Sequence, residues 1–370
     1  MGLKMRFSLY RVSSWWVFKF VVGVLAIDGG ARAGGESLAL LDPAQAGPDF
    51  FVQGEYVGTV GGKRKVAAQV VARGDGVVGG VLYLGGLPGA GWDGVTRFHF
   101  GGKRNGDVAR FVGVMGERLE FENPNFSATL QEGLLRGTAQ MFHNIVEETS
   151  FEMSRVERCS PTQGAVPPSG AIVLFDGTSV DQWNHGRIVE QGFLDVGAIS
   201  KRQFKSLKLH IEFRTPFMPT SRGMGRGNSG LYIKNEWEVQ IVDSFGWNSE
   251  NRKFERLANF GRCGGIHELV KPRVNMCFPP LSWQTYDVTF IAAQFDGHGE
   301  RVLPAMMTVV HNGVLIHDKF VLPPTPRGTG ESKEAEFGPI YLQNHSNPVR
   351  FRNIWVIEVD EDSEVSVGRH

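Results

Sequence analysis

The chain has 370 residues, and its 39 Lys and Arg residues balance its 39 Asp and Glu residues, so its formal net charge is zero. This length exceeds the ~100–200 residues usual for one domain and predicts two domains. Hydrophobic residues make up 41% of the chain and charged residues 21%, a composition that excludes wholesale disorder. The balanced charge provides no basic surplus for DNA or RNA, so we predict no nucleic-acid partner.

Glycine is the compositional outlier, because its 48 residues are roughly twice the ~7% average usage. The glycines are scattered among runs of Val, Phe, Thr and Trp and follow no collagen period. This pattern is typical of short strands joined by tight turns. We therefore predict an all-β protein.

The N-terminal segment has the features of a secretory signal peptide. Basic residues precede and interrupt an apolar run at residues 15–27, and the sequence Ala31-Arg32-Ala33 follows it. A basic region, a short apolar region and an A-x-A site are typical of a cleaved signal. We predict a signal peptide over residues 1–33 and an exported protein, located in the periplasm, at the cell surface or outside the cell. A retained anchor is the alternative; after cleavage we expect no transmembrane helix.

Residues 34–160 contain short strand-like runs separated by Gly-rich connectors, which predict a small antiparallel β domain of unknown role, either a sandwich or a barrel. Its expected strands include residues 50–52, 65–71, 80–84, 97–100 and 150–156. Pro, Gly and Ser are concentrated in residues 160–170, so we place a linker at 161–169. A second β domain is expected at 170–360, followed by an acidic tail at 361–370.

Alternation of apolar and polar residues predicts the strands of the second domain. Every second residue is apolar in residues 207–214 and again in residues 236–242. Asn312-Gly313 predicts a two-residue hairpin, since a type I′ turn needs positive φ at both positions. Further expected strands are residues 286–290, 307–311 and 349–359.

Polar side chains occupy the other face of the two alternating strands. Paired carboxylates on such a face raise one another's pKa and supply acid–base catalysis. A solvated outer face is the ordinary alternative, but a face with Glu, His, Arg and Gln suits a polyhydroxylated ligand. The first strand contributes His210, Glu212 and Arg214, and the second contributes Glu236, Glu238 and Gln240.

The sequence RGMGRGNSG at residues 222–230 has the glycine density of a phosphate-binding loop. No helical pattern follows it, so the Rossmann and P-loop interpretations fail, and we predict no nucleotide cofactor. Arg226 and Asn228 in this segment either point into a site or belong to a structural turn.

Near the C-terminus a polar group surrounds Asn347-Pro348, and it consists of Gln343, His345, Arg350 and Arg352. His345 is a candidate site residue, with a structural histidine as the alternative. The sequence contains neither HExxH spacing nor a GxSxG motif, which disfavours a zinc protease and a serine hydrolase.

The three cysteines, Cys159, Cys263 and Cys277, form no CxxC pair and no disulfide framework. Cys263 and Cys277 are candidates for a bridge in an oxidising compartment, which spacing alone does not establish.

An ordered set of short motifs over residues 170–358 resembles the 3-keto-disaccharide hydrolase domain family. The motifs are LFDG at 174–177 with Trp183, EFR at 212–214, GNSG at 227–230, EVQI at 238–241 with Asp243, CGGI at 263–266, WQTYD at 283–287, HNG at 311–313, LQNH at 342–345 and FRNI at 351–354. The resemblance implies a concanavalin A-like jelly-roll sandwich. It also implies an exported glycoside-processing enzyme that acts on sugars already oxidised at C3. Residues 34–160 lie outside it.

The implied chemistry begins at the acidic C2 proton beside a C3 ketone. A base forms the enolate and expels the C1 glycosidic oxygen, and water then adds to the enone. On the matching positions, Glu238 is implied as the base or as a metal ligand, His345 is its rival, and Asp243 orients the set. A divalent metal ion is a candidate cofactor that would stabilise the enolate as a Lewis acid. The candidate residues for substrate binding are Arg226, Asn228, Gln240, Gln343, Glu212, Arg214 and Arg352.

Two positions depart from the pattern of the family. His267 replaces a tyrosine that commonly follows the Gly-Ala-Ile stretch, and Gln343-Asn344-His345 replaces Gln-Asp-His. Both changes bear on substrate preference and leave the chemistry in place.

Two other functions remain open from the sequence. An ordinary retaining glucanase would use two carboxylates on one strand, but Asp243 has the opposite parity to Glu238, so a bulge would be needed. A non-catalytic, lectin-like protein would bind carbohydrate on the same polar face without cleaving it.

Overall fold

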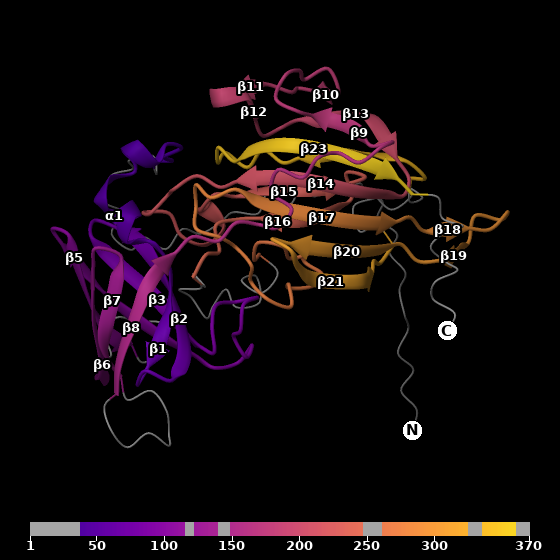
Figure 1. Ribbon diagram of the computed structural model, residues 1–370. Helices are drawn as coiled ribbons and strands as arrows, with labels where there is room; N and C mark the ends of the chain where they lie inside the picture. The colour runs from indigo at the N-terminus through magenta and orange to yellow at the C-terminus, as the bar shows by residue number, and fades with distance from the viewer. Residues whose placement is uncertain (1–37, 115–121, 140–148, 247–260, 325–334, 360–370) are drawn as a thin grey trace, which may run out of the picture. The chain divides into compact units, whose positions relative to one another are not determined.

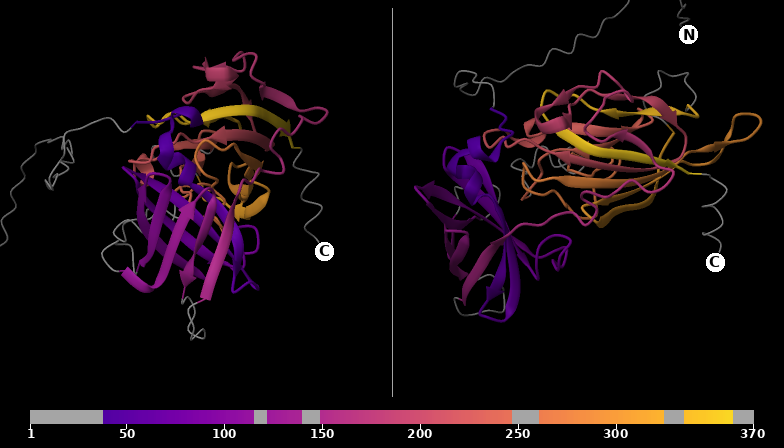
Figure 2. Two further views of the ribbon diagram at one scale, coloured as in Figure 1. Left: turned by 60° about the vertical axis from the view of Figure 1, so that its left-hand side comes forward. Right: turned by 45° about the horizontal axis from the view of Figure 1, so that its top comes forward.

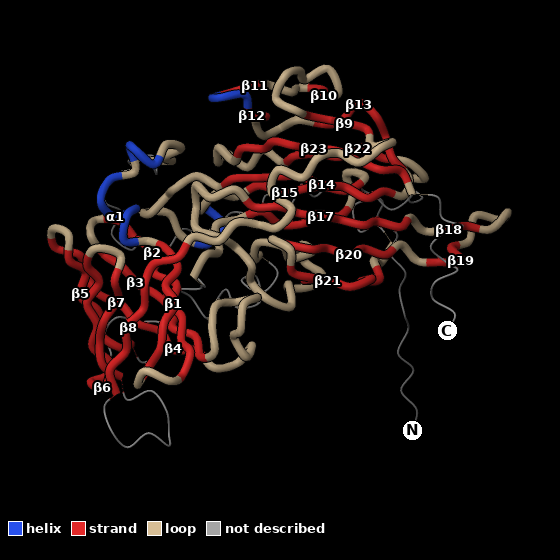
Figure 3. Tube along the Cα trace, in the orientation of Figure 1, coloured by secondary structure: helices blue, strands red, loops and turns tan. Residues whose placement is uncertain are grey.

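The computed structural model describes residues 38–114, 122–139, 149–246, 261–324 and 335–359 (Figure 1). Strands dominate these residues, as Figure 3 shows, and the predicted all-β class is confirmed. The predicted signal peptide and acidic tail lie outside the described residues. Within the described ranges, no helix has the length and apolar character needed to cross a membrane.

The first eight strands form a closed antiparallel barrel, in which β1 pairs with both β2 and β8. The left view of Figure 2 shows these strands side by side. The interior is filled by apolar side chains that include Tyr56, Phe100 and Phe111. The barrel strands are β1 (Gly54–Val60), β2 (Arg64–Gly74), β3 (Val77–Leu84), β4 (Arg97–Asn105), β5 (Val108–Val114), β6 (Glu122–Gln131), β7 (Leu134–Ala139) and β8 (Thr149–Val156).

A short helical segment precedes the barrel, formed by the 3₁₀ turn η1 (Pro43–Gln45) and the helix α1 (Gly47–Val52). The strand predicted at residues 50–52 is therefore wrong. Pro48 and Asp49 in the first turn favour a helix start, and three consecutive apolar residues carry no strand alternation. Phe50 packs edge-on against Phe217, 5.3 Å between ring centroids.

The remaining strands form two larger sheets and a small hairpin. The five-stranded sheet has the order β10 (Trp183–Asn184), β13 (Ile199–Phe204), β22 (Gly338–Leu342), β15 (Ser229–Ile233) and β16 (Trp237–Ile241). The eight-stranded sheet has the order β11 (Ile188–Val189), β12 (Phe193–Leu194), β23 (Arg350–Glu358), β14 (Leu207–Arg214), β17 (Gln284–Ile291), β20 (Met306–His311) and β21 (Val314–Val321), with β9 (Ile172–Phe175) beside β23. The hairpin pairs β18 (Gln294–Phe295) with β19 (Arg301–Leu303), and the short 3₁₀ turns are η2 (Glu190–Gly192) and η3 (Gly223–Gly225).

The two larger sheets share one hydrophobic core. Leu209, Ile211 and Phe213 of β14 belong to the same buried cluster as Val239 and Ile241 of β16. Each sheet therefore turns its apolar face toward the core and its polar face away from it. Figure 1 shows β23, β14, β17, β20 and β21 side by side in this order.

Several predicted strands agree with the structure. The strand expected at residues 207–214 coincides with β14, and the alternation of 236–242 corresponds to β16. Asn312 and Gly313 have φ values of 49° and 79° and join β20 to β21, as expected for a type I′ hairpin.

The polypeptide from Ser37 to His370 forms one compact unit that contains the barrel and both sheets. The segment predicted as a linker lies against the eight-stranded sheet, where the Thr162 hydroxyl donates to Asp287 at 2.7 Å and Asn353 donates to the Ala165 carbonyl at 3.0 Å. The division into separate domains at 34–160 and 170–360 stays a prediction.

Candidate active site

A row of polar side chains crosses the outer face of the five-stranded sheet. Tyr232 of β15 pairs directly with Glu238 of β16 and, on its other side, with Tyr341 of β22. Ile266 bridges Val239, and the His267 amide donates to the Glu238 carbonyl at 2.9 Å. This register places His267 opposite Glu238, where cross-strand neighbours on one face have Cβ atoms about 4.5–5.5 Å apart.

A second row beside the first consists of amides and glycines. Gly230 pairs with Gln240, and the Gly230 carbonyl accepts a hydrogen bond from the backbone N–H of Gln343 at 2.9 Å. A Cβ atom at Gly230 would lie 2.4 Å from Oε1 of Glu238. Glycine at this position therefore leaves the space that the Glu238 carboxylate occupies.

The Glu238 side chain is 6% exposed and accepts a 2.6 Å hydrogen bond from the Tyr232 hydroxyl. The side-chain nitrogen Nε2 of Gln343 in turn donates to the Tyr232 hydroxyl oxygen at 3.2 Å. A donor that points at a carboxylate fixes its orientation. The hydrogen bond from Tyr232 therefore holds the Glu238 carboxylate in one orientation.

Buried polar atoms without a hydrogen-bond partner gather on the same two rows. Within the part of the chain that the structure describes, they are Oε1 of Gln240, Oε1 of Gln343 and Nδ1 of His267. An unsatisfied buried polar atom is costly, and a cluster of them is typical of a place where a polar ligand binds. Sugar hydroxyls have the donors and acceptors that these atoms require.

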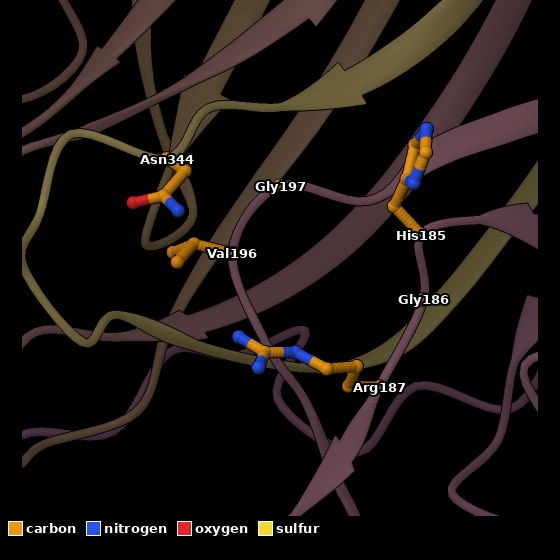
Figure 4. Close-up of a pocket in the computed structure, with 6 residues that line it drawn as sticks. All are labelled: His185, Gly186, Arg187, Val196, Gly197 and Asn344. Atoms are coloured by element: carbon orange, nitrogen blue, oxygen red, sulfur yellow. The ribbon is translucent and has the colours of Figure 1, made fainter.

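A hollow of about 400 Å³ is lined in part by the segment that follows β22 (Figure 4). Asn344, which lines it, directly follows Gln343, so the hollow and the polar rows share one stretch of chain. The lining is His185, Gly186, Arg187, Val196, Gly197 and Asn344. Its imidazole, guanidinium and amide groups are suited to hydrogen bonds with hydroxyl groups.

The structure places two predicted site residues in an ion pair beneath the surface. Arg226 is fully buried and donates to Asp243, to the Ala72 carbonyl at 3.2 Å and to the Gln53 side chain at 3.3 Å. Asp243 lies beyond the end of β16 and is 2% exposed. These contacts tie the sheet to barrel strand β2, and the predicted catalytic and binding roles of Asp243 and Arg226 stay predictions.

Asn228 and Gln240 remain together beside the candidate base. The Gln240 amide nitrogen donates to Oδ1 of Asn228 and to the Ser229 carbonyl, each at 2.8 Å. The Asn228 backbone amide donates to Asn347 at 2.8 Å. His345 is exposed in the turn between Gln343 and Asn347, at the edge of the polar rows.

The second predicted polar face is not brought to Glu238. Glu212, Arg214 and Arg352 lie on β14 and β23, on the outer face of the eight-stranded sheet. Since the sheets pack through their apolar faces, their polar faces point in opposite directions. Alternation within each strand predicts which residues share a face, but not that two such faces form one site.

Hydrogen bonds satisfy the Glu212 carboxylate on that opposite face. Burial alone raises the pKa of Glu212, but its polar neighbours lower it to about 2. These neighbours are the His210 imidazole at 3.7 Å, the Arg352 guanidinium at 2.7 Å, the Asn353 amide at 2.9 Å and the backbone N–H of Gly164. The arrangement explains Glu212 as an anchor for the segment around Gly164.

Tyr232, Tyr341 and His267 lie in the polar rows but were not among the predicted site residues. Tyr232 has the same parity as Gly230 in the preceding strand, so strand alternation combined with a hairpin register could have placed it beside Glu238. His267 was singled out in the sequence only as a departure from the family pattern. Its position opposite Glu238 depends on the β-bridge between Val239 and Ile266, which no local sequence pattern predicts.

The described residues do not fit a divalent metal site made by the protein alone. Such ions are held by several carboxylate or imidazole groups. Among the described ranges there is no grouping of three or more His, Cys, Asp or Glu side chains able to hold one. The Glu238 carboxylate accepts from the Tyr232 phenol, and we derive no step through a metal.

These features define an all-β protein with a polar, carboxylate-bearing sheet face. The sequence pattern described as "3-keto-alpha-glucoside-1,2-lyase-like domain" matches residues 170–357, and the chain belongs to this family. The predicted resemblance is confirmed, and family membership supports an enzyme that acts on glycosides.

Three crystal structures of proteins from Parabacteroides distasonis ATCC 8503, each named a "putative glycosyl hydrolase", are similar to part of the chain. The first is 30% identical, covers 52% of this chain and 85% of its own, and has a TM-score of 0.46. The second is 14% identical over 52% of this chain and 94% of its own length, with a TM-score of 0.39. The third is 19% identical over 51% of this chain and 99% of its own length, with a TM-score of 0.36. These scores are too low to define the fold of this chain. No curated protein matches it.

Proposed function

We propose that this protein is an exported enzyme that cleaves 3-keto-glycosides by abstraction of the C2 proton, elimination and hydration. The observation that carries the proposal is the position of Glu238, between the Tyr232 hydroxyl and His267 on a polar sheet face. Family membership supports the substrate class. The concanavalin A-like jelly roll and the location in the periplasm, at the cell surface or outside the cell belong to the same proposal.

Glu238 acts as the base in the first step. Its carboxylate removes the C2 proton, the electrons of the C2–H bond form the enolate of the C3 ketone, and the C1–O bond breaks as the enone forms. The hydrogen bond from Tyr232 keeps the carboxylate oriented toward one face of the sugar. The Gln343 amide nitrogen uses one N–H toward Tyr232, and its second N–H is suited to hold the C3 oxygen as its charge develops.

The departing C1 oxygen needs a proton, and His267 is placed to supply it. Its ring shares the sheet face with Glu238, and Nδ1 is buried without a partner among the described residues. A base on β16 and an acid in the turn bridged to β16 reach the two ends of the C2–C1–O unit of one sugar. Water then adds to C1 of the enone, and C2 regains a proton, which completes a net hydrolysis.

The hollow lined by His185, Arg187 and Asn344 is the proposed place for the leaving group. It adjoins Gln343 through the shared segment 343–344. An aglycone or second sugar bound there would direct the C1 oxygen away from the sheet. Substitution of Arg187 would then raise KM for a disaccharide more than for a small aryl glycoside.

The test compares a 3-keto-glucoside with its unoxidised parent, with and without chelator, for the wild type and Glu238→Gln. Cleavage of the keto form alone, lost in Glu238→Gln, is the expected result. Glu152→Gln is the matched control, since Glu152 lies on the barrel surface with its side chain 60% exposed.

Three outcomes would overturn the proposal. Cleavage of the parent sugar would indicate an ordinary retaining glucanase, although β15 and β16 place a single carboxylate on this face. Binding of either sugar without turnover would indicate a lectin-like protein. Loss of cleavage on chelation, restored by a divalent ion, would show that groups other than these residues carry the elimination.

A further inference from the structure

Two of the three cysteines lie together in the core behind the candidate active site. Cys263 is 0% exposed and Cys277 is 1% exposed, and both belong to the hydrophobic cluster shared by the two sheets. Cys159 is exposed and distinct from this pair. All three are thiols in this structure.

The two buried cysteines are linked through two polar residues. The Cys263 backbone N–H donates to the Ser244 hydroxyl at 3.2 Å, and the Cys277 backbone N–H donates to Oδ1 of Asn275 at 3.3 Å. The Ser244 hydroxyl and Oδ1 of Asn275 lie 3.0 Å apart. The Cys263 sulfur is 3.2 Å from the Tyr286 hydroxyl. Two cysteines that share one core and are joined through Ser244 and Asn275 are candidates for a disulfide bridge.

The environments of the two thiols differ. Burial raises the pKa of Cys277 well above its ordinary value, and the neighbouring Cys263 raises it further. Burial also raises the pKa of Cys263, but its polar neighbours bring it below the ordinary value. Cys263 is therefore the first of the two thiols to ionise.

We propose that Cys263 and Cys277 form an intramolecular disulfide when the protein meets a disulfide oxidant. The Cys263 thiolate attacks one sulfur of the oxidant and releases a thiolate, which leaves a mixed disulfide. Cys277, after losing its proton, attacks the Cys263 sulfur and releases the second thiol of the oxidant. The two cysteines lose two protons and two electrons, and the oxidant is reduced to two thiols.

The bond would fix one edge of the candidate active site. The segment after Cys263 pairs with β16, since the Gly264 amide donates to the Gln240 carbonyl at 2.8 Å and the His267 amide donates to the Glu238 carbonyl at 2.9 Å. The Tyr286 hydroxyl donates to the same Gln240 carbonyl at 2.7 Å. A disulfide would tie the start of this segment to Cys277, and so restrict the local opening that moves His267 away from Glu238.

The experiment incubates the full chain with oxidised or with reduced glutathione, alkylates it under denaturing conditions and maps its peptides by mass. After oxidation we expect a Cys263–Cys277 cross-linked peptide and a label on Cys159 alone; after reduction we expect three labels. Because the thiols are buried, the incubation also includes a sample refolded in the presence of the oxidant. Three labels after refolding with oxidant, or a cross-link that contains Cys159, would overturn the proposal.

A thermal measurement on variants gives a second test. The unfolding temperature of the wild type and of Cys159→Ser should be higher after oxidation than after reduction, and that of Cys277→Ser should not change. A redox-dependent shift that persists in Cys277→Ser would contradict the proposal. If Cys277→Ser fails to fold, the peptide map of the wild type and Cys159→Ser decides the question. Neither readout depends on sugar cleavage.

Discussion

The outer faces of the two sheets carry similar residues and differ in how these residues are satisfied. On the eight-stranded sheet, Glu212 has hydrogen-bond donors for both oxygens and lies beneath the segment around Gly164. On the five-stranded sheet, the Tyr232 phenol donates to Glu238, and buried acceptors on Gln240 and Gln343 lack partners among the described residues. The comparison shows that a carboxylate on a polar strand face marks a site only where its surroundings leave polar atoms for a ligand.

The largest effect should follow from the loss of the Glu238 carboxylate. Glu238→Gln keeps the shape of the side chain and removes the base, so kcat on a 3-keto-glucoside should fall about 10³-fold. Steady-state kinetics measures this effect, with thermal unfolding to show that the fold persists. Activity within a few-fold of the wild type would mean that Glu238 is not the base and that the polar face of the five-stranded sheet is not the active site.

The substitution His267→Gln should act on the leaving group alone. A poor leaving group such as an alkoxide needs a proton, so its elimination should slow about 10²-fold, whereas a nitrophenolate leaves without one. The rates on alkyl and nitrophenyl 3-keto-glucosides therefore separate acid catalysis from general damage. His298→Gln, in an exposed turn, is the matched control. Equal losses on both substrates would remove His267 from the proposed role.

Glu212→Gln should have the opposite signature to Glu238→Gln. It removes charged hydrogen bonds to Arg352, Asn353 and Gly164, so the free energy of unfolding should fall by about 2 kcal/mol. The kcat of the folded enzyme should not change, since Glu212 faces away from the candidate site. Denaturant unfolding combined with kinetics measures both effects, and a selective loss of kcat would contradict the separation of the faces.

A methyl group at Gly230 tests the space beside the base. In Gly230→Ala the new Cβ would approach Oε1 of Glu238 to 2.4 Å and displace the carboxylate. Turnover should fall roughly 10-fold, because small misplacements of a catalytic group are expensive. Gly225→Ala is the control, since its Cβ would have no neighbour within 4 Å. An active Gly230→Ala variant would show that the position of Glu238 is not critical.

The smallest expected effect is on the pH dependence of stability. The folded pKa of Glu212 is lowered from its ordinary value of 4.5 to about 2, so its contribution to stability is complete above pH 4.5 and is lost as the pH falls toward 2. Over this window the neighbouring His210 is protonated in the folded and unfolded states, because its folded pKa is raised above 6.5. Glu212→Gln should therefore lose less stability than the wild type between these pH values. If the stabilities of the wild type and Glu212→Gln fell in parallel between these pH values, the Glu212 carboxylate would not be stabilised by its hydrogen bonds.

Local features of the sequence predicted much of the fold. Alternation placed β14 and β16 and assigned Glu238 and Gln240 to one face, and Asn312-Gly313 marked a hairpin. The prediction of a strand at residues 50–52 was wrong because it relied on three consecutive apolar residues and ignored Pro48, which favours a helix start. The failures beyond that are of another kind.

Those failures concern contacts between distant segments. His210, Glu212 and Glu238 look alike as strand residues, and only the packing of the two sheets sends their faces in opposite directions. In the same way, Arg226 follows a glycine-rich stretch that resembles a ligand loop, yet its guanidinium pairs with Asp243 and contacts barrel strand β2. A single sequence contains no record of which strands become neighbours, so the membership of the site required the structure.

The most direct test of the central claim follows the C2 hydrogen of a 3-keto-glucoside cleaved in D₂O. If Glu238 removes the C2 proton and water adds to an enone, the released 3-keto sugar must contain deuterium at C2, detected by NMR or mass spectrometry. The same sugar incubated with Glu238→Gln corrects for spontaneous exchange. Deuterium at C2 in the product at the first turnovers is the result that our account predicts. Protium retained at C2 during rapid cleavage would contradict it and indicate direct hydrolysis at C1.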